Sequence, residues 1–342
     1  MRCEPGHPSC GTGCRDCRIV APVWRPNTVS AELITLGEAL GVVAATEAGP
    51  LAAGAAMRMD FAGAEATVAI GVSRLGHASA WIGRVGADAI GTMVLDRLRA
   101  ERVDISACRI EPDVSSGLML RERRTADRIR VTYYRKGFAG SRLSPDDIDP
   151  ARIAAARVLH LTGITPALSE TARAAVHFAM DAAVTAGVTV SLDINYRAAL
   201  WSAADAAAEL GDLVAHSNIV FAGPEEAALL VPRQAPAEMA KALAALGPSQ
   251  VVLKLGADGA LALQDGEPIE QPAVPVTCVD PVGAGDAFVA GYLAALLDGE
   301  SISARMRSAA TCGAFAVAGV GDWQGLPTRQ EFGLLDAADI DR

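Results

Sequence analysis

The chain has 342 residues, of which 51% are hydrophobic and 20% charged, so it can bury a sizeable core and is not disordered as a whole. This length fits one large α/β domain or two small ones. The net charge of −10 argues against nucleic acid as the main partner, although a local pair of arginines can still hold a small anionic ligand. The longest strongly apolar stretch, residues 287–297, is too short to cross a bilayer, so we expect no membrane partner.

Residues 1–31 differ from the rest of the chain, because they are rich in Cys, Gly, Pro and Arg and show no periodicity. We expect them to form a disordered extension. The alternative is a zinc site at Cys14 and Cys17 with His7 as an extra ligand, although no second CxxC pair follows. The segment lacks the apolar region of a signal peptide, so we expect a cytoplasmic protein.

From residue 33 onward, short apolar runs alternate with alanine-rich or amphipathic segments. In chain order we expect a strand at 33–36, a helix at 66–75, a strand at 79–82, a helix at 90–100, a strand at 158–161, a helix at 169–187, strands at 188–193, 219–221 and 251–255, and helices at 286–297 and 308–320. Strands that alternate with helices predict an α/β fold whose mostly parallel sheet is covered on both faces.

Two segments interrupt this alternation. Residues 39–61 and 117–135 look like antiparallel hairpins with polar faces, and 128–133 alternates cleanly between polar and apolar residues. We expect them to form a small lid over one end of the sheet, because the second hairpin carries Tyr133 and Arg135, which suit a polar ligand. The alternative is surface decoration without a role in binding.

The loop at 280–286, which reads DPVGAGD, is the most informative stretch for function. Its glycines allow close backbone approach, and the helix that follows points free N–H groups and its positive dipole end at whatever lies above the loop. A phosphate in transfer suits such a site, and Asp286 at its mouth can accept a proton from an attacking hydroxyl. The alternative is that Asp286 only caps the helix. The loop is neither a Walker A motif nor a dinucleotide GxGxxG.

Three further segments carry candidate site residues. Residues 254–260 can wrap the phosphates of a nucleotide, with Lys254 adding charge, or form an ordinary hairpin turn. Residues 193–197 follow the carboxyl end of a predicted strand, where α/β sheets place ligands, and Arg197 can make a forked contact to an anion. Gly63 precedes a predicted helix and marks either a ligand contact or a plain βα turn.

Together these segments resemble the ribokinase-like (PfkB) carbohydrate kinases over residues 33–335. The matching motifs are AGAE at 62–65, IGRVGAD at 82–88, KLG at 254–256 and DPVGAGD at 280–286. Within that family the chain is most similar to the 2-keto-3-deoxygluconate kinases, through YYRK at 133–136, HLTGITP at 160–166 and DINYR at 193–197. The resemblance implies a three-layer α/β/α core, with lid segments inserted at about 39–61 and 110–139.

The resemblance also implies roles for individual residues. Asp286 would be the general base, and the anion hole for the transferred phosphoryl group would be formed by Gly283, Ala284 and Gly285. The sugar site would be lined by Gly63, Ala64, Glu65, Thr67, Tyr133, Arg135, Arg197, Asp286 and Asp322. The ATP site would be lined by Asn195, Arg197, Lys254, Gly256, Asp258, Gly259, Gly283 and Gly285. Mg²⁺ would arrive with ATP and be ordered through water by Glu226.

The substrate expected from this resemblance is a sugar acid, 2-keto-3-deoxygluconate, because Arg135 and Arg197 would supply two cations for a carboxylate. One alternative is a fructokinase or ribokinase-type enzyme for a neutral sugar, since Thr67 and Met119 depart from the family pattern. Others are a binding protein that lost activity, and a nicotinamide dehydrogenase, which the absence of GxGxxG after the first strand disfavours. Lids in this family often pair between subunits, so we expect a homo-oligomer.

Overall fold

The structure is a computed structural model that describes residues 30–125 and 128–335. The expectations of a disordered extension and of a zinc site at Cys14, Cys17 and His7 therefore lie outside the described residues, apart from residues 30 and 31. Within the described ranges, no helix is long and apolar enough to span a bilayer.

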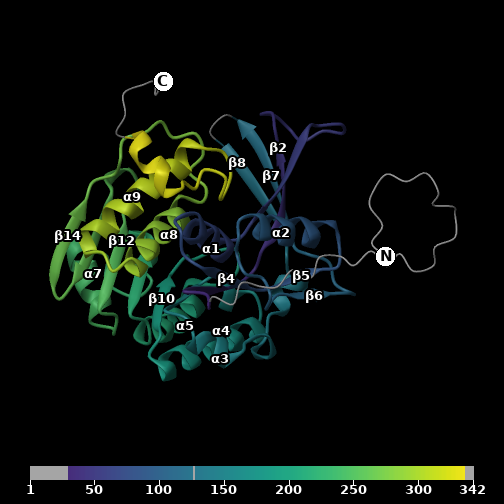
Figure 1. Ribbon diagram of the computed structural model, residues 1–342. Coiled ribbons are helices and arrows are strands. Elements are labelled where there is room, and N and C mark those ends of the chain that lie inside the picture. Colours follow the sequence, from purple (N-terminus) through teal and green to yellow (C-terminus); the bar gives the residue numbers. More distant parts are fainter. Residues whose placement is uncertain (1–29, 126–127, 336–342) are drawn as a thin grey trace, which may run out of the picture.

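The core of the fold is an eight-stranded sheet (Figure 1). In spatial order its strands are β14 (Glu267–Gln271), β13 (Ala260–Gln264), β12 (Gln250–Lys254), β11 (Ile219–Ala222), β10 (Thr189–Asp193), β9 (Val158–Thr162), β1 (Leu33–Leu36) and β4 (Ser79–Ile82). The strands from β12 to β4 pair in parallel, and β13 and β14 add an antiparallel edge. The prediction of a mostly parallel sheet is confirmed, whereas β13 and β14 were not foreseen.

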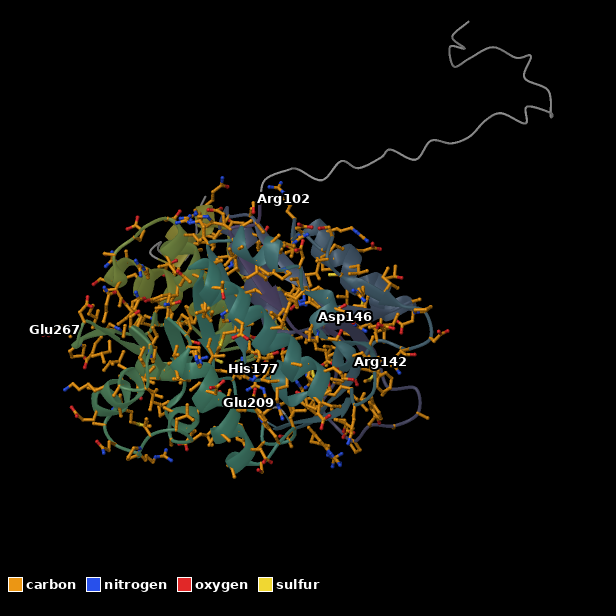
Figure 2. The ribbon with its side chains drawn as sticks, turned by 90° about the horizontal axis from the view of Figure 1, so that it is seen from below. Arg102, Arg142, Asp146, His177, Glu209 and Glu267 are labelled. Carbon is orange, nitrogen blue, oxygen red and sulfur yellow. The ribbon has the colours of Figure 1, made fainter. Side chains whose placement is uncertain are left out.

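Helices cover both faces of this sheet (Figure 1). One apolar core joins the sheet to α1 (Ala64–Arg74), α2 (Ala89–Ala100), α8 (Ala284–Leu297) and α9 (Ile302–Ala318). The core on the opposite face joins it to α3 (Pro150–Ala154), α4 (Glu170–Ala186), α5 (Ala203–Ala215), α6 (Pro224–Ala227) and α7 (Pro236–Ala244). Figure 2 looks onto this second face, where His177 of α4 meets Glu209 of α5 at 2.6 Å.

A second, four-stranded sheet lies apart from the core, with β2, β7 and β8 projecting upward in Figure 1. Its strands in order are β3 (Met57–Ala62), β2 (Leu40–Ala45), β7 (Leu118–Thr125) and β8 (Arg128–Tyr134). The two expected hairpins are confirmed as the antiparallel pairs β2–β3 and β7–β8, and β2 and β7 join them in parallel. We call this unit the small sheet. A separate short pair is formed in parallel by β5 (Arg84–Gly86) and β6 (Arg109–Glu111).

Several helix boundaries differ from the sequence expectation because of their caps. The helix expected at 308–320 begins at Ile302, since the side chain of Ser301 accepts a hydrogen bond from the Ala304 N–H. The helix expected at 286–297 begins at Ala284, directly after Gly283. Helix α4 ends as expected, because Gly187 adopts a left-handed φ of 70° just after its last turn. The helices α5 and α7 were not foreseen.

Candidate active site

The loop before α8 has a backbone conformation that only glycine allows at one position. Gly283 precedes the first turn of α8 with a φ of 78°, and a Cβ atom there would collide with the backbone oxygen of Asp322. No side chain in the described part of the chain caps this helix. The first N–H groups of α8 therefore remain available to an anionic ligand, and the positive end of the helix dipole adds to their attraction.

Asp286 lies in the first turn of α8, at the mouth of this anion site. Its Oδ1 accepts a hydrogen bond of 3.3 Å from the side-chain amide of Asn195, which follows β10 in a left-handed conformation with a φ of 39°. Burial and then the neighbouring Asp193 raise the pKa of Asp286 to about 7, against the opposing charges of Lys254 and Arg197. Such a carboxylate is a competent general base near neutral pH. The interpretation that Asp286 only caps the helix is wrong, because Gly283 occupies the cap position.

A buried ion pair borders the anion site. The Nζ atom of Lys254, the last residue of β12, lies 2.8 and 2.6 Å from the two oxygens of Asp193, the last residue of β10. A Cβ atom on Gly285 would lie 3.4 Å from the same Nζ, so the lysine borders the first turn of α8. Burial alone lowers the pKa of Lys254, but Asp193 and Glu226 raise it overall, so the lysine keeps its positive charge.

Glu226 is held at the same edge of the sheet by backbone donors. Its Oε2 accepts from the Gly223 N–H at 2.7 Å, and its Oε1 accepts from the Tyr196 N–H at 3.1 Å. Burial and then Asp193 raise its pKa. Over 30–125 and 128–335, no group of three or more His, Cys, Asp or Glu residues forms a metal cage. This donor set fits Mg²⁺ that arrives on a polyphosphate and keeps its waters, rather than a metal held by the protein alone.

A cavity of about 560 Å³ opens beside Lys254 and extends between the β12–β13 turn and the helices α8 and α9. Four of the residues expected at an ATP site line it, namely Lys254, Gly256, Gly259 and Gly285. Its far wall is mostly apolar and includes Val276, Phe288 and Val317. The turn at 254–260 is both a hairpin turn between antiparallel strands and one rim of this cavity. Asn195, Arg197, Asp258 and Gly283, which were also expected there, do not line it.

The residues expected to bind the sugar fall into three groups, the first of which lies at the base of the small sheet. Arg135 follows β8, forms an ion pair with the buried Glu38, and stacks over the ring of Tyr133 at 5.2 Å. Burial raises the pKa of Glu38, and the charge of Arg135 opposes this rise. The ring of Tyr133 is 43% exposed, so it remains open to a ligand.

The second group belongs to the start of α1 and lies deeper. The carboxylate of Glu65 is buried and accepts hydrogen bonds of 2.6 Å from the hydroxyls of both Thr162 and Thr165. Ala64 and Thr67 are also buried, and a Cβ atom on Gly63 would press against the backbone oxygen of Glu38. The side chain of Glu65 therefore holds α1 against β9.

The charges of Arg197 and Asp322 both act on Asp286, in opposite directions. Arg197 is exposed, its guanidinium donates to the Tyr196 carbonyl at 3.2 Å, and its charge lowers the pKa of Asp286. Asp322 is placed by its backbone contact with Gly283. Burial raises the pKa of Asp322 to about 6, although the charge of Arg121 opposes the rise.

The sequence matches the pfkB family carbohydrate kinases over residues 30–329. The chain belongs to this family. The expectation of a carbohydrate kinase with a ribokinase-like fold is thus confirmed. A 2-dehydro-3-deoxygluconokinase of Thermoproteus tenax is 36% identical over 309 residues, which is 90% of this chain and 94% of the relative. One of Bacillus subtilis is 34% identical over 303 residues, 88% of this chain and 94% of the relative.

Among solved structures, a putative ribokinase II from E. coli in complex with ATP and Mg²⁺ superimposes with a TM-score of 0.83 at 25% identity. The match covers 90% of this chain and 99% of that one. The described elements of this PfkB kinase therefore follow an arrangement that a nucleotide-bound relative also has.

In this PfkB kinase, residues expected for catalysis and residues expected for the nucleotide come together around the first turn of α8 and the carboxyl ends of the sheet strands. Sequence reasoning did not assign a role to Asp193, Glu38 or Asp280, although each is buried and charged. Asp193 could have been found, because an acidic residue directly after a buried strand lies at the ligand-binding edge of an α/β sheet. Glu38 gave no comparable signal, because its partner Arg135 is distant in sequence.

Proposed function

We propose that this PfkB kinase transfers the γ-phosphoryl group of ATP to the primary hydroxyl of 2-keto-3-deoxygluconate, giving 2-keto-3-deoxy-6-phosphogluconate. The observation that carries the proposal is Asp286, a carboxylate with a pKa of about 7 beside the uncapped N-terminus of α8. The relatives named for this reaction, at 36% and 34% identity over most of the chain, support the choice of substrate.

The chemistry follows from the positions of these groups. The oxygen of the sugar hydroxyl forms a bond to the γ-phosphorus while Asp286 accepts the proton of that hydroxyl. The bond between the γ-phosphorus and the bridging oxygen breaks, and this oxygen leaves as part of ADP. The N–H groups around Gly283, Ala284 and Gly285 face the oxygens of the transferred group. Lys254 adds positive charge next to this turn, and Asp193 keeps the lysine in place. Positioning and electrostatics therefore supply most of the rate.

ATP fits the cavity of about 560 Å³, with its base against the apolar wall and its phosphates toward Lys254 and Gly285. Asn195, Arg197 and Asp258 do not line the cavity and are proposed as further nucleotide contacts. Glu226, held by two backbone N–H groups, would hold Mg²⁺ through water. When bound, Mg²⁺ neutralises charge on the β- and γ-phosphates.

The sugar acid fits between the base of the small sheet and Asp286. Arg197 is the better candidate for its carboxylate, because Arg135 already shares its charge with Glu38. Tyr133 and Asp322 would contact hydroxyl groups, while Gly63, Ala64, Glu65 and Thr67 shape the floor at the start of α1. The small sheet would close over the sugar as a lid and exclude water. The alternative is a neutral sugar such as fructose, which carries no carboxylate for an arginine pair to bind.

We also propose that the protein is cytoplasmic and forms a homo-oligomer through the outer face of the small sheet. Tyr134 and Met59 present 49% and 57% of their surface there, and apolar side chains exposed on one face favour an interface. A molar mass twice that of one chain in solution would support the oligomer, and a monomer at working concentration would contradict it.

The function is tested by ADP release from Mg-ATP with a panel of acceptors. The panel holds 2-keto-3-deoxygluconate, its galactose-derived epimer, gluconate, fructose, ribose and adenosine. We expect kcat/KM for the keto-deoxy acids to exceed that of the others by about a hundred-fold or more, which corresponds to roughly 2.7 kcal/mol. A neutral sugar that gives the highest kcat/KM would keep the kinase chemistry and overturn the substrate, and Thr67 and Met119 would then be examined first.

A further inference from the structure

A second cavity, of about 290 Å³, lies between the small sheet and the loop that leads to α8. We call it the arginine cavity, because Arg58 of β3 and Arg121 and Arg123 of β7 line it. The register places Arg58 and Arg121 opposite Ala44 of β2, so the three strands present these side chains on one face. The residues proposed for the sugar and the nucleotide are absent from its described lining.

The charges of the arginine cavity are not balanced. Asp280 is the partner of the buried Arg121, with Nη2 and Oδ2 3.2 Å apart. Within residues 30–125 and 128–335, neither Arg58 nor Arg123 has an acidic group within 4.0 Å. Glu122 also borders the cavity. Its side chain belongs to the opposite face, because it alternates with Arg121 and Arg123 along β7.

We propose that the arginine cavity binds a small molecule that carries a phosphate group, at a site separate from the sugar and nucleotide sites. Guanidinium groups bind phosphate through forked pairs of N–H donors, and Arg58 and Arg123 offer such groups without a carboxylate of their own in the described ranges. The volume accommodates a phosphate group with a short carbon chain.

The bound phosphate would act on catalysis through Asp280. The carboxylate of this residue accepts hydrogen bonds from the Val282 N–H at 3.2 Å and the Gly321 N–H at 3.3 Å. Val282 precedes Gly283, and Gly321 precedes Asp322, so Asp280 holds both segments that flank Asp286. A phosphate in the cavity competes with Asp280 for Arg121 and loosens these two segments. The site is therefore a regulatory one, and its occupation lowers kcat.

Inorganic phosphate is the probe for this site, titrated calorimetrically into the full-length protein. A Mg²⁺ complex of the β,γ-imido analogue of ATP is present to fill the nucleotide site and the anion hole. We expect one phosphate site in the wild type. The double variant Arg58→Gln/Arg123→Gln should weaken it by at least about ten-fold for each arginine removed. The matched control Arg130→Gln removes an exposed arginine from the other face of β8 and should bind phosphate as the wild type does.

Three results would overturn the proposal. The first is equal phosphate affinity in the double variant and the wild type. The second is displacement of phosphate by 2-keto-3-deoxygluconate, which would make the cavity part of the sugar site. The third is a wild-type kcat at saturating substrates that phosphate leaves unchanged, which would remove the regulatory role. Calorimetric binding does not need turnover, so a failure of the proposed substrate leaves the comparison of the double variant with the wild type intact. Wild-type kinetics of the double variant without phosphate would show that it folds.

Discussion

The Nζ atom of Lys254 lies 2.6 and 2.8 Å from the two carboxylate oxygens of Asp193, next to the turn that begins α8. This pair joins the ends of two strands that are not neighbours in the sheet, since β11 runs between β10 and β12. It also sets the electrostatics of Asp286, because Asp193 raises the pKa of that carboxyl and Lys254 lowers it. The catalytic pKa thus depends on residues that need not touch the sugar.

The first prediction concerns the acidic limb of the pH profile. Asp286 must be deprotonated to act as a base, so kcat/KM should fall as the pH drops through about 7. Removing a positive charge raises the pKa of a neighbouring carboxyl, so Lys254→Met should move this limb to higher pH by about one unit. The measurement is kcat/KM for the sugar acid between pH 5 and 9.

Two variants control for the loss of a lysine. Lys254→Arg keeps the charge beside Asp193 and should leave the limb near its wild-type position. Lys241→Met removes an exposed lysine of α7 and should change nothing. A limb that stays in place in Lys254→Met would show that the lysine does not set the pKa of Asp286.

The second prediction concerns the recognition of a carboxylate. Arg197→Ala should lower kcat/KM by about ten- to a hundred-fold for 2-keto-3-deoxygluconate and by only a few-fold for fructose, because a charge-assisted hydrogen bond is lost only with the acid. Comparing the two substrates cancels any effect on ATP. Arg197→Lys keeps the charge without the planar fork and should fall between. Equal losses on both substrates would refute the carboxylate contact.

The third prediction concerns the buried pair of Glu38 and Arg135, whose side chains are 1% and 12% exposed. Arg135→Met leaves a buried carboxylate without its partner, which should cost about 3–5 kcal/mol of unfolding free energy at pH 8. Burial raises the pKa of Glu38, and loss of Arg135 raises it further. A raised carboxyl pKa means that stability is lost as the pH rises, so the deficit should shrink at pH 5.

Urea unfolding at both pH values measures this deficit. The double variant Glu38→Gln/Arg135→Met removes the orphaned charge and should recover part of the stability at pH 8. An Arg135→Met deficit that is the same at pH 5 and pH 8 would contradict the assignment of the cost to a charged Glu38.

Local patterns predicted the features that depend on neighbours in sequence. The alternation of strands and helices was readable because each element carries its own apolar period, and Gly283 and Asp286 could be placed together because only two residues separate them. The start of α9 was placed six residues late, since Arg305 and Arg307 make its first turns polar and Ser301 acts as the cap.

Long-range partners could not be predicted in the same way. Arg135 was expected to bind a ligand, and its ion pair with Glu38 was not foreseen. Glu38 precedes the first strand of the small sheet in the chain, whereas Arg135 follows the last one. Glu65 was expected at the sugar site, but the sequence did not indicate that its carboxylate accepts hydrogen bonds from Thr162 and Thr165, about 100 residues further along the chain. Many arginines and glutamates along the chain are equivalent candidates until tertiary packing selects among them.

The most direct test of the account is the turnover of Asp286→Asn. The amide keeps the shape of the side chain but cannot accept the hydroxyl proton, so kcat should fall by about 10²- to 10⁴-fold, while the Kd for Mg-ATP stays within a few-fold. Asp181→Asn, an exposed position on α4, is the matched control and should be fully active. A near-normal kcat in Asp286→Asn would contradict the role of this residue as the base.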